Sequence, residues 1–176
     1  ELLPPQQPFI VLQPVLHPAR LRDWEENSSN PYADLFENTH MLVVTDSNTQ
    51  EKAFQLANDL CALLKAKPYF SEPLEADGIT ARIEQLPKLT AVALLTMLVE
   101  KPGCDDARKM TNRAFFRFAS LNTLFDEQEF FGVSNLVNRE NITRALDELS
   151  ATLAEIRQMI DAGDEEGLQK MYQTAR

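Results

Sequence analysis

The feature that most constrains the fold is the uneven distribution of strand and helix patterns along the chain. Short apolar runs typical of strands occur only before residue 74, at PFIVLQPV, at HMLVVTD and, more weakly, at KPYFSEP. From Leu74 onward every periodic segment is helical, at about 75–100, 106–121, 127–136, 139–162 and 165–175. Two or three short strands cannot form a stable sheet unaided, so we expect their partner strands to lie outside this chain or in another copy of it.

This distribution predicts an α+β fold that is mostly α, with two domains. Residues 1–73 hold the strands, a polar irregular stretch at 19–38 and one helix at about 49–66, which Ser47 or Asn48 is placed to cap. Residues 74–176 form an all-helical domain. Because the chain begins with Glu1 rather than methionine, we expect it to be a piece of a longer protein.

Two helices of the second domain carry unusual patterns. The first, over 75–100, contains Pro87 in its interior, where a missing donor and a clash with the carbonyl of Ile83 cost about 3 kcal/mol in an ordinary helix, so we expect a kink. The second, over 139–162, has an apolar seam that predicts a bundle helix packed either within the chain or across a dimer. Its seam residues are spaced 4, 3, 4, 3 and 4 apart, namely Ile142, Leu146, Leu149, Leu153, Ile156 and Ile160.

Composition excludes several classes of function. The formal net charge of -10 repels phosphate backbones and anionic lipid, so we expect neither nucleic acid nor a membrane as partner. A small anionic ligand stays compatible, since it needs only one basic pocket. Two unclustered cysteines indicate reduced thiols in the cytoplasm, and His17 and His40 as the only histidines argue against a metal site. The five glycines form no phosphate-binding loop, so this chain alone is not expected to bind NAD or ATP through one.

Five segments, in order, are similar to the later part of the prephenate dehydrogenases. LHPARL stands where the family has a G-T-H-P-M-type segment, and ADLFENTHMLVV resembles its A-D-L-F-(E)-G-R stretch. EADGITARIEQLPKLTAVALL aligns without a gap on a family stretch ending S-H-L-P-H-L-L-A-A-A-L. FFGVSNLVNRENI resembles W-R-D-I-x-x-x-N-R-E-x-x, and the closing segment from Leu146 is typical of the family's last helices.

The resemblance implies both a fold and an activity. The expected fold is the end of a Rossmann-like domain followed by a helical dimerisation domain, with a homodimer formed through the helices. The expected activity belongs to tyrosine biosynthesis, the oxidative decarboxylation of prephenate or arogenate, which are small dicarboxylates. NAD or NADP is implied for the full-length protein, with no cofactor expected for this chain alone. Pro87 then belongs to an L-P turn whose kink either frees backbone groups beside the substrate or merely fits helix packing.

The same resemblance names the candidate site residues. His17 takes the catalytic position, where a histidine hydrogen-bonded to the substrate's 4-hydroxyl assists loss of its proton. Arg117 fits a carboxylate-binding arginine of the family. Arg113, four residues earlier, lies on the same helix face, and we call these two arginines the basic face. Lys88 and Gln85 replace two histidines of the S-H-L-P-H segment and are the remaining substrate-binding candidates.

The catalytic set is eroded relative to the family pattern. The glycines flanking the H-P motif are absent, a third histidine is replaced by Ala76, and the second family arginine falls near Leu121. His17 is therefore either catalytic or structural, and the basic face is either an anion site or a solvated surface. Three functions stay open: a divergent prephenate or arogenate dehydrogenase, a non-catalytic dimerising or ligand-sensing module, and a related dehydrogenase for another small carboxylic acid.

Overall fold

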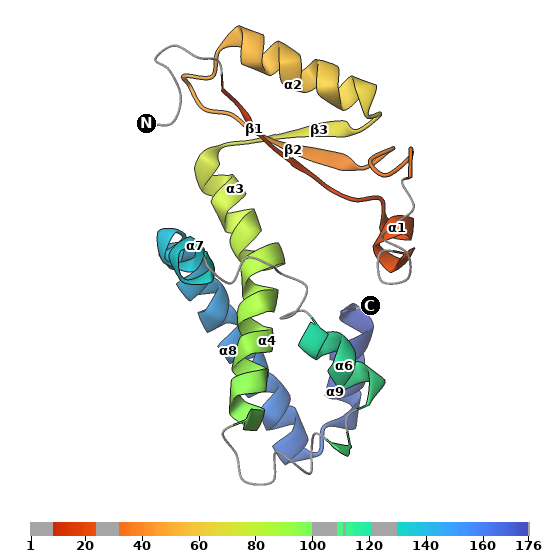
Figure 1. The fold of residues 1–176 in the computed structure, drawn as a ribbon. Coiled ribbons are helices and arrows are strands. Elements are labelled where there is room, and N and C mark those ends of the chain that lie inside the picture. The colour runs from red at the N-terminus through yellow and green to blue at the C-terminus, as the bar shows by residue number, and fades with distance from the viewer. Residues whose placement is uncertain (1–8, 24–31, 100–108, 111, 121–129, 176) are drawn as a thin grey trace. The chain divides into compact units, whose positions relative to one another are not determined.

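The chain has an α+β fold that is mostly helical, as the sequence predicts. The computed structural model describes residues 9–23, 32–99, 109–110, 112–120 and 130–175 (Figure 1). It divides into two compact units, Glu1–Ala76 and Asp77–Arg176. We refer to them as unit 1 and unit 2 and describe each by itself.

Unit 1 contains a three-stranded sheet in the order β1-β2-β3. The strands are β1 (Val11–Pro14), β2 (His40–Val44) and β3 (Lys67–Ser71), which confirms all three strand predictions. β1 runs antiparallel to β2 with Val11 opposite Val44, and β2 runs parallel to β3 with His40 opposite Lys67. The parallel pair needs a crossover, which helix α2 (Glu51–Leu63) provides (Figure 1).

The core of unit 1 lies between the sheet and α2. Met41 and Val43 alternate along β2 toward the helix, where Ala57 and Cys61, one turn apart, meet them. Val43 and Ala57 are completely buried. Small residues on α2 let the helix approach the sheet closely, and this packing holds the ends of the strands in place.

Two predictions for unit 1 are wrong. The stretch expected to be irregular contains a short helix, α1 (Pro18–Asp23). Neither Ser47 nor Asn48 caps α2, which follows Gln50, a residue without a side-chain cap. Instead the Oδ1 atom of Asp46 accepts hydrogen bonds from the Asn48 N–H at 2.9 Å and the Thr49 hydroxyl at 3.1 Å, a side-chain turn that competes with capping.

A long helical segment carries the proline of unit 2. It consists of α3 (Pro73–Thr80), the π-helical turn η1 (Ala81–Gln85) and α4 (Leu86–Val99). The Leu86 N–H donates to the carbonyl of Ala81, five residues back instead of four. The hydrogen-bond register therefore changes just before Pro87, a residue with no N–H to place, and the distortion expected at the proline takes the form of a π-turn.

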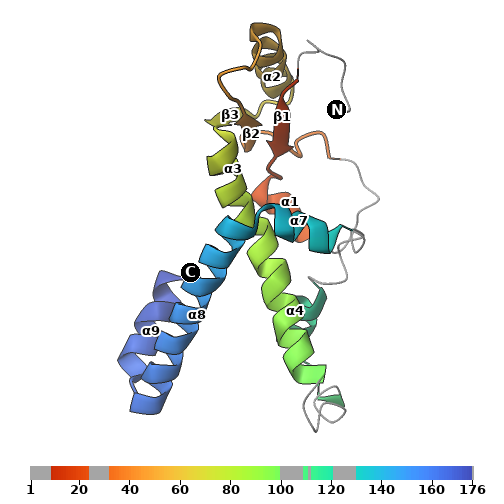
Figure 2. The same cartoon turned by 90° about the vertical axis from the view of Figure 1, so that its left-hand side faces the viewer.

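The rest of unit 2 is helical. It contains α6 (Arg113–Ser120), α7 (Phe131–Val137), α8 (Arg139–Ala162) and α9 (Glu165–Thr174). Gly163 ends α8 in the left-handed conformation at φ 66°, and the Asp164 side chain accepts a hydrogen bond from the Gly167 N–H to begin α9. α8 and α9 lie side by side (Figure 2).

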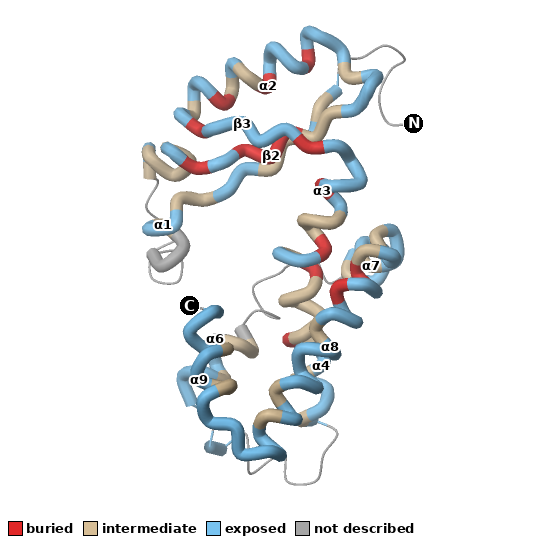
Figure 3. Tube along the Cα trace, turned by 180° about the vertical axis from the view of Figure 1, so that it is seen from behind, coloured by how far each residue is buried: buried red, intermediate tan, exposed pale blue. Residues whose placement is uncertain are grey.

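The apolar seam of α8 is covered most completely at its beginning. Ile142 is 5% exposed, whereas Leu146, Leu153 and Ile160 are 37%, 55% and 61% exposed. α8 packs against η1 and α4 and also against α9, and the seam residues Leu149 and Ile156 are half-buried. Most of the later turns of α8 are nevertheless exposed (Figure 3). Within the described ranges, no helix is long and apolar enough to cross a membrane.

Candidate functional site

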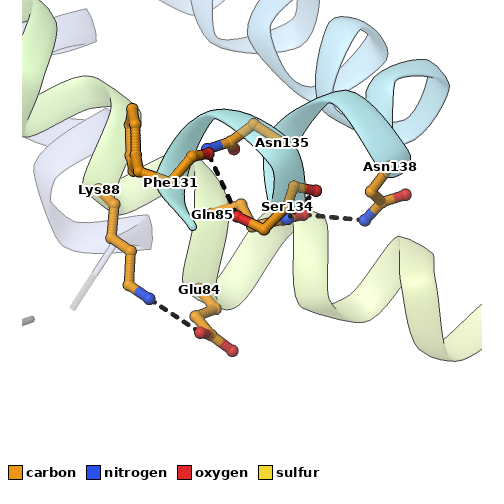
Figure 4. A network of polar contacts seen from close by, with 7 residues as sticks. All are labelled: Glu84, Gln85, Lys88, Phe131, Ser134, Asn135 and Asn138. Carbon is orange, nitrogen blue, oxygen red and sulfur yellow. Dashed lines mark hydrogen bonds and ion pairs between the residues drawn. The ribbon is translucent and has the colours of Figure 1, made fainter. Parts of the chain in front are cut away.

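Gln85 lies at the centre of a hydrogen-bond network that joins η1 to the α7–α8 junction (Figure 4). Its side chain is buried, with Nε2 donating to the Ser134 carbonyl at 3.1 Å and Oε1 accepting from Asn138 Nδ2 at 2.9 Å. Asn138 also donates to the Asp77 carbonyl at 2.8 Å, and its own Oδ1 accepts from Asn141 at 2.9 Å. We call these residues the amide clasp.

The amide clasp explains why a polar side chain is buried beside the π-turn. A buried amide left without partners costs about 1–3 kcal/mol, and here both ends of Gln85 are satisfied. Asn138 occupies the position before α8 without capping it, because its side chain is directed to Gln85 and Asp77 instead. Asn138 lies in the FFGVSNLVNRENI segment, but its contacts with Gln85 and Asp77 do not follow from the sequence pattern.

Lys88 and Glu84 form an ion pair one helical turn apart beside the amide clasp (Figure 4). Lys88 Nζ lies 2.9 Å from Glu84 Oε1. The lysine side chain is 14% exposed and the glutamate side chain 41%, so the cation is sheltered while the carboxylate is open. Nearby on α7, Asn135 Nδ2 donates to the Phe131 carbonyl at 2.6 Å, and Asn135 Oδ1 is buried without a partner among the described residues.

A second contact fixes η1 from the side of α8. Arg82 Nη2 lies 2.8 and 3.1 Å from the two carboxylate oxygens of Glu148. Both side chains are more than half exposed, so this pair contributes little to stability. The ion pair links η1, which contains Gln85 and directly precedes the α4 turn that carries Lys88, to α8.

His17 precedes α1 and acts as its cap. The His17 Nδ1 atom accepts a hydrogen bond from the Ala19 N–H at 3.2 Å, and the His17 N–H donates to the Leu35 carbonyl at 2.8 Å. A neutral ring whose Nδ1 accepts carries its proton on Nε2. Among the described residues Nε2 makes no hydrogen bond, so a neutral His17 presents an N–H donor to a ligand.

An ion pair on α1 stabilises the His17 segment. Arg20 lies 2.7 Å from Asp34 and stacks on the Tyr32 ring with its guanidinium carbon 4.1 Å from the ring centroid. The hydrogen bond from Arg20 lowers the pKa of Asp34. The loop at Asp34 is thereby tied to α1.

The basic face is only partly described. Arg113 begins α6, is exposed and makes no ion pair with another described residue. Arg117 lies four residues later on α6, but its side chain is outside the described part of the chain. The structure therefore brings Gln85 and Lys88 together on one turn of unit 2, while His17 lies in unit 1 and is described separately.

Solved structures of two dehydrogenases match most of the chain. An arogenate dehydrogenase from Synechocystis covers 96% of it with a TM-score of 0.72 at 15% identity. A prephenate dehydrogenase from Aquifex aeolicus, in complex with hydroxyphenyl propionate and NAD+, covers 81% with a TM-score of 0.71 at 19% identity. The fold is that of the prephenate and arogenate dehydrogenases. No family model matches the chain, and no curated protein matches it by sequence.

The match confirms, at the level of the fold, the resemblance predicted from five sequence segments. The chain spans 59% of the length of the Synechocystis enzyme and 49% of that of the Aquifex enzyme. The sequence reasoning found the H-P and L-P segments because they carry recognisable motifs. The contact of Asn138 with Gln85 and that of Glu84 with Lys88 were not predicted. The partners in the first contact are 53 residues apart in sequence, and the motif that contains Asn138 does not report them.

The described residues of unit 1 do not fit a dinucleotide. A cavity of about 280 Å³ opens between the start of β1, the end of β2 and the beginning of α2. Close approach of a pyrophosphate to a helix start uses glycines, and residues 1–77 contain none. Asp46 also places a carboxylate at the beginning of α2, where it would repel a phosphate.

Proposed function

We propose that this chain is the C-terminal portion of a prephenate or arogenate dehydrogenase of tyrosine biosynthesis. The observation that carries the proposal is the match of 96% of the chain to an arogenate dehydrogenase structure. In this assignment residues 1–73 are the end of the nucleotide-binding domain and residues 74–176 the helical domain. NAD or NADP binds through residues outside this chain, because the described residues of unit 1 offer no dinucleotide cradle.

His17 is the residue we assign to the reacting hydroxyl. Oxidation at the ring carbon requires the 4-hydroxyl of the substrate to lose its proton. With Nδ1 held by the Ala19 N–H, a neutral His17 donates from Nε2 and orients the hydroxyl oxygen. To accept the proton at Nε2, the ring must carry its own proton on Nδ1, and this tautomer ends the hydrogen bond from the Ala19 N–H. The cap at 3.2 Å is long enough to be given up at low cost.

The carboxylates of the substrate are assigned to the basic residues of unit 2. Arg117 and Arg113 provide guanidinium groups on one face of α6, and Lys88 provides a sheltered ammonium group. Gln85 supports this set by fixing the turn that carries Lys88, since both ends of its amide are engaged in the amide clasp. Its role differs from that of the family histidine it replaces.

We further propose a homodimer formed through unit 2. The later turns of α8 leave Leu153 and Ile160 more than half exposed on one seam, and Val133, Leu136 and Val137 of α7 are also exposed. Apolar surface on this scale, placed on helices, favours association with a partner of the same pattern.

One observation favours a second candidate, a non-catalytic dimerising or ligand-sensing module. His17 serves as a helix cap, and Gln85 is occupied by the amide clasp, so two positions that carry histidines in the family have structural contacts here. In this alternative the scaffold binds a carboxylate ligand without oxidising it.

Turnover separates the two candidates. The full-length polypeptide is offered prephenate and then arogenate, each with NAD and with NADP, and formation of reduced cofactor is followed by absorbance. Turnover with either substrate supports the dehydrogenase. A folded protein that binds cofactor and substrate without forming reduced cofactor supports the non-catalytic module.

A further inference from the structure

The Glu84–Lys88 pair presents two opposite charges at a position that we assign to substrate binding. Lys88 Nζ and Glu84 Oε1 lie 2.9 Å apart. The pair has no net charge, so it offers no net attraction to a ligand that brings only a carboxylate. A ligand that brings a carboxylate and an ammonium group together can match both partners.

We propose that Glu84 and Lys88 recognise the α-amino-acid end of the substrate, which makes this chain specific for arogenate over prephenate. The inference rests on the proposed function and deepens it. Arogenate carries an ammonium and a carboxylate on its side-chain end, whereas prephenate carries a keto group and a carboxylate there. Lys88 holds the carboxylate of that end, and Glu84 accepts hydrogen bonds from its ammonium group.

The exposure of the two side chains fits this division of roles. The lysine, at 14% exposed, is sheltered from water, which strengthens its attraction for a carboxylate. The glutamate, at 41%, is open enough to receive an ammonium group without moving out of a buried position. A keto group in place of the ammonium has no N–H to donate, so Glu84 gains no hydrogen bond from prephenate and stays paired with Lys88 alone.

The amide clasp makes the pair a fixed recognition element. Gln85, between the two charged residues in sequence, is held by Ser134 and Asn138 (Figure 4). The backbone of the turn is therefore set before a ligand binds, so little ordering has to occur on binding. Selectivity then depends on charge matching at this turn rather than on a change of shape.

The test compares substrates and variants of the full-length polypeptide. Glu84→Gln removes the anion and keeps the shape, Glu84→Asp keeps the anion, and Glu155→Gln is the control at an exposed glutamate of α8. We expect the unaltered protein to favour arogenate in kcat/KM. Since a hydrogen bond to a charged group contributes about 10- to 100-fold, Glu84→Gln should lower kcat/KM for arogenate by that factor. The value for prephenate should stay within about threefold, Glu84→Asp should keep the preference, and the control should change nothing.

Binding of the two products tests the pair independently of turnover. Calorimetry compares tyrosine with 4-hydroxyphenylpyruvate, which differ in the same amino and keto groups. A preference for tyrosine that Glu84→Gln abolishes supports the proposed role of the pair. If neither substrate is oxidised, that absence of turnover overturns only the proposed activity. A preference for prephenate, or equal losses for both ligands in Glu84→Gln, would overturn the inference while leaving the dehydrogenase assignment intact.

Discussion

His17 combines a structural contact with a proposed chemical role in one side chain. Its Nδ1 atom caps α1 through the Ala19 N–H, and its Nε2 atom is the one left to meet a substrate. The H-P motif identified the residue from sequence, but the cap could not be predicted because α1 itself was expected to be irregular. The structural and chemical roles can be separated by substitution, since asparagine caps a helix and lacks the imidazole.

We expect His17→Ala to lower the free energy of unfolding by about 1 kcal/mol, because the cap of α1 is lost. His17→Asn should stay within about 0.5 kcal/mol of the unaltered protein, since its side-chain oxygen accepts from the same N–H. Urea denaturation measures both values. Equal losses in the two variants would show that the contact with Ala19 does not stabilise the helix.

The Arg20–Asp34 pair predicts a dependence of stability on pH. The hydrogen bond from Arg20 lowers the pKa of Asp34 in the folded protein below its unfolded value, which is about 3.9. The stabilisation of the folded state by the Arg20–Asp34 pair is therefore fully present at a pH above the unfolded pKa of Asp34. It is lost as the pH falls through the lower pKa of Asp34 in the folded protein. Acid titration of thermal stability should show a smaller loss below about pH 4 in Asp34→Asn than in the unaltered protein. An identical acid profile would contradict the assignment.

At the scale of elements, the π-turn η1 and the amide clasp form one structural feature. The sequence predicted the helix over 75–100 and a distortion at Pro87, both from local pattern and proline chemistry. It could not predict that the distortion is a π-turn, nor that Gln85 is buried. The partners of Gln85 are 49 and 53 residues away in sequence, and no periodicity reports such contacts.

A double-mutant cycle on Gln85 and Asn138 tests the amide clasp. Each alanine substitution leaves the other amide, the buried one of Gln85 or the half-buried one of Asn138, partly unsatisfied, so we expect a coupling free energy of about 0.5–3 kcal/mol between them. Chemical denaturation of the two single variants and the double variant gives this value. The control combines Gln85→Ala with Asn58→Ala on α2, whose side chain bonds only within its own helix and should be additive. Additivity in both pairs would rule out the clasp as a stabilising unit.

At the scale of the whole molecule, the order of strands and then helices is read correctly from the sequence because the longer elements have a clear period, whereas the short helix α1 has none and was not predicted. The three strands of the sheet and the apolar seam of α8 also follow from the pattern of apolar residues. What covers the remaining seam depends on surfaces that local pattern does not specify. Leu153, on the predicted seam, is 55% exposed in the single chain, which is the reason for proposing a dimer.

Light scattering after size exclusion tests the dimer. We expect this chain to elute with about twice its mass of 20.0 kDa, and Leu153→Glu to shift the mass toward the monomer by placing a charge in the seam. Glu155→Gln, an exposed position of the same helix, serves as the control and should leave the mass unchanged. A single 20.0 kDa species from the unaltered chain at micromolar concentration would contradict the dimer.

The most direct measurement of the central claim is the rate of reduced-cofactor formation by the full-length polypeptide and its His17→Asn variant. Both are supplied with the substrate and nicotinamide that give the higher rate, and their folding is matched by denaturation. Because removal of a general acid–base group costs about 10²–10⁴-fold, we predict that kcat falls by that factor while stability is unchanged. Equal rates in the two proteins would contradict the assignment of His17 to the chemistry, and the absence of turnover in a folded, cofactor-binding protein would contradict the dehydrogenase itself.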